Sequence, residues 1–142
     1  MAKSEKQKLK LLYIIQCLME KTDEEHAVTT QEIIDYLALQ GITAERKSIY
    51  TDIDLLIDFG MDIIKKPGRS GGYTLASRQF ELAELKLLVD AVQSSKFITT
   101  KKSRELIGKL ETLCSKYEAT QLHRQVVVTN RNKAINENIY YN

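Results

Sequence analysis

The chain has 142 residues, of which 43% are hydrophobic and 28% are charged, and its formal net charge is +2. This length allows one ordinary domain or two small ones, and the composition is that of a soluble globular protein. The distribution of charge excludes a strongly basic domain, because residues 1–79 carry a net charge of −1 and residues 80–142 carry +3. Any nucleic-acid-binding surface must therefore be a local patch.

The first predicted element is a helix over residues 9–19. Apolar residues occupy well over half of its surface, which predicts that it is mostly buried. Lysines are frequent just before and at its start, and this pattern favours a solvated helix end over a phosphate contact.

The second predicted helix spans residues 30–40. Thr29 and Glu32 have the spacing of a capping box, in which each satisfies a backbone amide of the other. Thr30 and Gln31 follow at the helix start, where backbone amides and short polar side chains can meet a phosphate. We therefore include both residues among the candidate DNA contacts.

The third predicted helix follows after a short turn, with Thr43 as its N-cap and Gly60 as its terminator. One side is apolar and the other is polar, so the helix has an exposed face. Two helices joined by a short turn that contains glycine are typical of a helix–turn–helix, whose second helix enters the major groove with its N-terminal end. The candidate contacts at this end are Arg46, Lys47, Ser48, Tyr50 and Thr51.

A basic hairpin is predicted next, with strands over residues 61–66 and 73–76 and a glycine-rich turn between them. Its candidate contacts to the DNA backbone or minor groove are Lys66, Arg69 and Ser70. A helix pair followed by such a hairpin predicts a winged helix–turn–helix domain over residues 1–79.

Two further helices are predicted over residues 82–94 and from Thr99 or Thr100 to about Tyr117. Each carries an apolar stripe, so the two should pack as an antiparallel hairpin. Val126 to Thr129 reads as a short strand. The stripes fit either a core within one chain or a dimer seam, and we expect residues 80–142 to form the linker and dimerisation region of a homodimer. The predicted fold class is mainly α with a small β-hairpin.

Two segments carry a family resemblance: AERKSIYTDIDLLIDFGMDI and GGYTLASRQFELAELKLLVDAVQSSKFIT. They resemble the N-terminal half of bacterial WYL-domain transcriptional regulators. The resemblance implies a winged-helix DNA-binding domain, a helical linker and a ligand-sensing domain. Thr51 stands where the family often has arginine, and the chain has no Trp and stops about where the sensing domain would begin. We therefore expect the effector-binding domain to be missing, and the effector is unknown.

Catalytic motifs are not visible: the sequence has no GxSxG, no HExxH and no GxxxxGK[ST]. The segment from Pro67 to Gly72 is glycine-rich, but it lies between two strands and is better explained as a wing turn than as a nucleotide site. We predict no enzyme activity, no metal site and no cofactor. Cys17 and Cys114 are predicted to be reduced, buried thiols of a cytoplasmic protein that does not span a membrane.

Two functions remain open. The leading one is sequence-specific binding of double-stranded DNA by a transcriptional regulator. The alternative is a winged-helix adaptor that binds proteins and not DNA. The carboxylates of Asp54 and Asp58, beside the presumed DNA face, favour this alternative.

Overall fold

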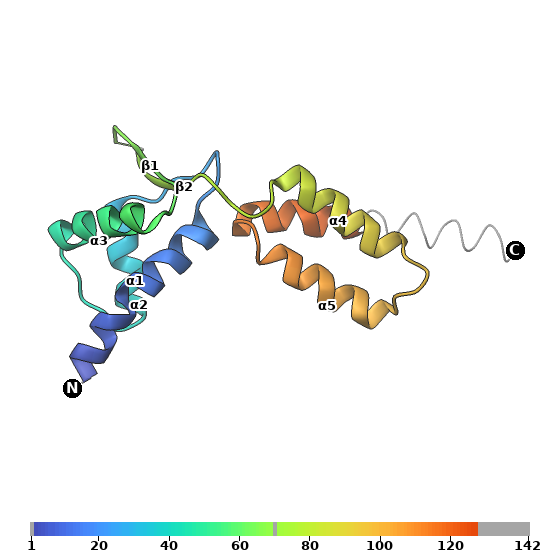
Figure 1. Ribbon diagram of the computed structural model, residues 1–142, viewed down its shortest axis with the longest axis horizontal. Coiled ribbons are helices and arrows are strands. Elements are labelled where there is room, and N and C mark those ends of the chain that lie inside the picture. The colour runs from blue at the N-terminus through green and yellow to red at the C-terminus, as the bar shows by residue number, and fades with distance from the viewer. Residues whose placement is uncertain (1, 70, 128–142) are drawn as a thin grey trace, which may run out of the picture. The chain divides into compact units, whose positions relative to one another are not determined.

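The computed structural model describes residues 2–69 and 71–127 (Figure 1). The chain divides into two compact units, unit 1 (Met1–Arg78) and unit 2 (Gln79–Asn142). Unit 1 contains α1 (Ala2–Lys21), α2 (Thr30–Leu39), α3 (Arg46–Phe59), β1 (Ile63–Lys66) and β2 (Gly72–Leu75). Unit 2 contains α4 (Leu82–Ser94), α5 (Thr100–Glu111) and a further helix over residues 116–127. The predicted fold class is confirmed.

Three helices and the hairpin enclose the core of unit 1. Each helix contributes fully buried aliphatic side chains, among them Ile14 and Leu18 of α1, Ile33 and Leu37 of α2, and Ile49 and Ile53 of α3. The core includes Cys17, whose burial raises the pKa of its thiol to about 11, so the thiol is protonated at neutral pH. The first helix is less buried than its composition predicts, since Leu12 is 60% exposed.

The N-terminal cap of α2 is the predicted one. The Thr29 hydroxyl accepts from the Glu32 backbone amide, and the Glu32 carboxylate accepts from the Thr29 amide. The predicted Thr43 cap of α3 is wrong, because the chain stays extended after the buried Ile42 and the cap position falls to Glu45. Gly60 ends α3 with a φ of 119°, as predicted.

The hairpin is attached to the segment that precedes α2. Its strands are antiparallel, with Ile63 opposite Leu75 and Lys66 opposite Gly72. The Val28 amide donates to the Tyr73 carbonyl at 3.0 Å, and the Tyr73 amide donates to the Val28 carbonyl at 2.7 Å. This pair of bonds fixes the start of β2 beside the segment that precedes α2, while the turn extends away from the helices of unit 1 (Figure 1).

Unit 2 differs from the prediction at its C-terminal end. Helix α4 has the predicted bounds, and Thr99 caps α5 by accepting from the Lys102 amide. However, α5 ends at Glu111, so the predicted continuation of this helix to about Tyr117 is wrong, and Ile107 supplies the buried side chain of α5.

A third helix completes unit 2. It begins after Ser115, whose hydroxyl accepts from the Glu118 amide at 3.1 Å, and it brings the fully buried Leu122 into the core. The predicted strand is wrong at Val126 and Val127, which are helical. Packing of Val126 against the core outweighs the β-propensity of valine, which depends strongly on context. Val128 and Thr129 lie outside the described residues.

Candidate nucleic-acid interface

An open groove of about 560 Å³ lies in unit 1 between the start of α2, the first half of α3 and the hairpin. We call it the basic groove, because four of its lining residues are cations and none is acidic: Arg46, Lys65, Lys66 and Arg69. Two different elements supply these cations, so the charge arises from the fold and not from a run in the sequence. Such a local patch suits a polyanion, although the chain as a whole is nearly neutral.

The start of α2 forms one wall of the basic groove. Thr30 is mostly buried, and its hydroxyl donates to the Tyr73 phenol oxygen at 3.4 Å, which joins α2 to the hairpin. Gln31 is exposed and joins α2 to α3, since its side-chain oxygen accepts from Arg46 Nη2 at 3.4 Å. Its amide nitrogen donates to Asp35 Oδ1 at 2.9 Å. These contacts hold the Arg46 side chain at the N-terminal end of α3, beside α2.

The exposed face of α3 carries Lys47, Tyr50 and Thr51, and of these only Tyr50 lines the basic groove. Tyr50 is 46% exposed and presents both a ring and a hydroxyl. The Thr51 hydroxyl donates to the Lys47 carbonyl at 3.1 Å, so its proton is used inside the helix.

Ser48 does not share this face. It is half-buried, and its hydroxyl accepts from Lys10 Nζ of α1. The same ammonium forms an ion pair with Asp52 at 2.8 Å, and both side chains are largely buried. The structure therefore places Ser48 in the contact between α1 and α3, away from the candidate DNA surface.

The hairpin supplies the other cations of the basic groove. Lys66 Nζ donates to the Glu24 carbonyl at 3.3 Å, which connects the hairpin to the loop before α2. Arg69 is exposed in the turn, and Ser70 lies outside the described residues. Lys65 pairs with Asp54 at 2.8 Å, and the hydrogen bond and charge of Asp54 raise the pKa of the Lys65 ammonium.

The basic groove thus brings together six of the residues predicted from sequence: Thr30, Gln31, Arg46, Tyr50, Lys66 and Arg69. Lys47 lies on the exposed face of α3 outside it. Sequence reasoning missed Lys65. The sequence pattern did not indicate this residue. Strand β1 buries only Ile63, so it lacks the alternation of buried and exposed residues that would have assigned its side chains to two faces.

Residues 12–68 match the family model described as FokI, D3 domain. The match covers less than half of the chain and lies wholly within unit 1, from α1 to the turn of the hairpin. No curated protein and no solved structure matches the chain. None of the helices in the described ranges is long and apolar enough to cross a membrane.

Proposed function

We propose that unit 1 binds double-stranded DNA in a sequence-specific manner and that the chain acts as a transcriptional regulator without enzyme activity. The observation that carries the proposal is the basic groove, where Arg46 of α3 and three cations of the hairpin converge on one open surface. The match of residues 12–68 to a DNA-binding-related domain supports it, since that range includes Arg46, Lys65 and Lys66.

In this proposal α3 enters the major groove with its N-terminal end, and one DNA strand runs through the basic groove between α3 and the hairpin. Arg46, Lys66 and Arg69 neutralise phosphates and position the protein. Lys47 and Tyr50 are the exposed side chains at the start of α3 that can reach base edges.

Replacing Lys47 with alanine should weaken binding to the preferred sequence by about 1–3 kcal/mol, because a lysine can donate to guanine O6 and N7. Titration of the full chain against the preferred duplex and a random duplex measures the effect. Lys109→Ala, which removes an exposed lysine from α5, is the matched control. An equal loss on both duplexes would assign Lys47 to a phosphate, and no loss on either would remove it from the interface.

Replacing Arg69 with alanine should weaken binding to every sequence alike. The residue lies in the exposed turn, so its contribution should be electrostatic, and the slope of log K against log salt should fall by roughly one unit. Arg104→Ala, an exposed arginine of α5, controls for the loss of one charge. An unchanged slope would place the hairpin away from DNA.

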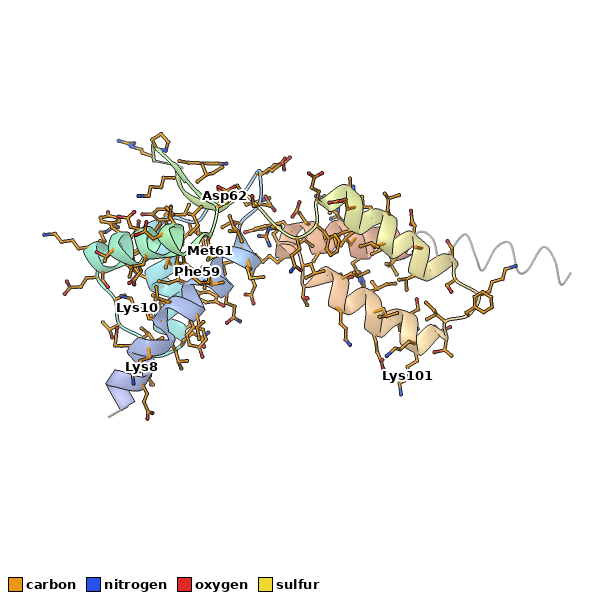
Figure 2. The ribbon with its side chains drawn as sticks, viewed as in Figure 1. Lys8, Lys10, Phe59, Met61, Asp62 and Lys101 are labelled. Carbon is orange, nitrogen blue, oxygen red and sulfur yellow. The ribbon has the colours of Figure 1, made fainter. Side chains whose placement is uncertain are left out.

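A protein-binding adaptor is the second candidate. It is favoured by the apolar end of α3, where Leu55 is 50% exposed and Phe59 is 82% exposed. Phe59 is labelled in Figure 2. Titration of random duplex DNA at several salt concentrations separates the two functions, because an adaptor has no salt-dependent DNA binding.

The remaining expectations stay predictions. They are the homodimer formed through residues 80–142, the WYL-regulator resemblance and the cytoplasmic location. Unit 2 does expose apolar side chains that a second copy would cover, since Leu87 is 70% exposed and Phe97 is 98% exposed.

A further inference from the structure

An acidic side chain lies in the middle of the proposed DNA-binding face. Asp54 is exposed one turn after Tyr50, on the side of α3 that also carries Lys47. The Asp54 side chain is 64% exposed, and its Oδ1 lies 2.8 Å from Nζ of Lys65, a residue that lines the basic groove. A carboxylate at this position repels DNA phosphates. A role for Asp54 in DNA binding therefore requires a contact with DNA that a neutral or basic side chain could not make.

We propose that Asp54 is a specificity-determining residue that accepts a hydrogen bond from the exocyclic amino group of a cytosine in the major groove. This inference rests on the proposed function of unit 1. An ionised carboxylate only accepts hydrogen bonds. Among the bases, cytosine presents an N4 amino donor in the major groove, guanine presents two acceptors, thymine presents an acceptor and a methyl group, and adenine sets an acceptor beside its donor. The carboxylate therefore favours cytosine and is repelled most strongly by guanine.

The ion pair with Lys65 lets this residue serve both states of the protein. In the free protein Lys65 of β1 donates a hydrogen bond to the Asp54 carboxylate. Both groups are exposed, so the pair is worth little and rearranges easily. On DNA, Lys65 can turn toward a phosphate while Asp54 faces the base. A wrong base then leaves the carboxylate without its water and without a donor, and specificity arises from this repulsion as much as from the correct contact.

Asp58 provides the matched control. It carries the same charge on the same side of α3, one turn beyond Asp54, and it is exposed. No salt bridge joins it to another residue within the described ranges. If the acids of α3 act only through bulk charge, replacing either of them has the same effect.

The test is a selection from a randomised duplex library with the full-length chain and its Asp54→Asn and Asp58→Asn variants. The wild-type chain should enrich a site with one position held as cytosine. Asp54→Asn should lose that preference by roughly tenfold, move it toward adenine and bind random duplex more tightly. Asp58→Asn should keep the wild-type preference at every position.

Titrations of defined duplexes then separate the possible failures. An Asp54→Asn variant with the wild-type preference overturns the inference, and so does an equal gain in affinity for all sequences in both variants. The proposed function survives either result, since duplex binding with a salt slope remains. A wild-type chain that binds no duplex at any salt concentration overturns the proposed function itself.

Discussion

Replacing Lys10 with methionine should lower the free energy of unfolding by about 3 kcal/mol, because it leaves the Asp52 carboxylate buried without its partner. Lys10 is 7% exposed, and its ammonium contacts both Asp52 and Ser48, so one side chain of α1 satisfies two polar groups of α3. Methionine keeps most of the length of the lysine stem and removes only the donors and the charge. The loss therefore reports the polar contact and not a cavity.

Chemical denaturation of the full-length chain measures this loss, and Lys8→Met is the control. Lys8 lies on the same helix two residues before Lys10, and its side chain is exposed (Figure 2). Its replacement should change stability by less than about 0.5 kcal/mol. The double variant Lys10→Met with Asp52→Leu should recover most of the loss, since replacing a whole buried pair with apolar groups is often neutral. Equal destabilisation by Lys8→Met and Lys10→Met would contradict the buried role.

The predicted ends of α2 and α4 match the structure to within a residue, because local chemistry determines them. The Thr29 capping box acts through backbone amides of its own first turn, and no distant residue can override it. The stripe of α4 likewise places Leu85 and Val89 in the core. At both of these ends the signal lies within a few neighbouring residues, whereas the local signal at Thr43 was misleading, because the cap position of α3 falls to Glu45.

Other differences between prediction and structure depend on residues far apart in the chain. Ser48 was predicted as a donor at the start of a recognition helix, but Lys10, which is 38 residues away, donates a hydrogen bond to its hydroxyl. Val126 has a strand-forming neighbourhood, yet a helix packs it against the core of unit 2. Likewise, the pairing of Lys65 with Asp54 requires the hairpin to fold back beside α3. For the same reason only part of the basic groove was predicted, because its cations come from separate elements that only the tertiary fold brings together.

Replacing Gly72 with alanine should destabilise unit 1 by about 3 kcal/mol and weaken DNA binding more than the loss of any single hairpin cation. Gly72 has a φ of 143°, and a Cβ atom there would lie 2.1 Å from the Val28 carbonyl oxygen. The hairpin must therefore move away from the segment before α2. This movement breaks the two backbone hydrogen bonds between Val28 and Tyr73, each worth about 1 kcal/mol, and adds backbone strain of about 1–3 kcal/mol.

Gly68→Ala separates the strain from the close approach. Gly68 also has a positive φ, 100°, but a Cβ atom at this position would meet nothing within 4 Å. It should therefore show the strain alone, about 1 kcal/mol, and keep the hairpin in place. Thermal unfolding and hydrogen exchange at the Tyr73 amide measure both effects. The contrary result is that Gly72→Ala loses no more thermal stability than Gly68→Ala and keeps the Tyr73 amide protected. The hairpin then does not depend on its contact with Val28, and side chains alone hold the walls of the basic groove.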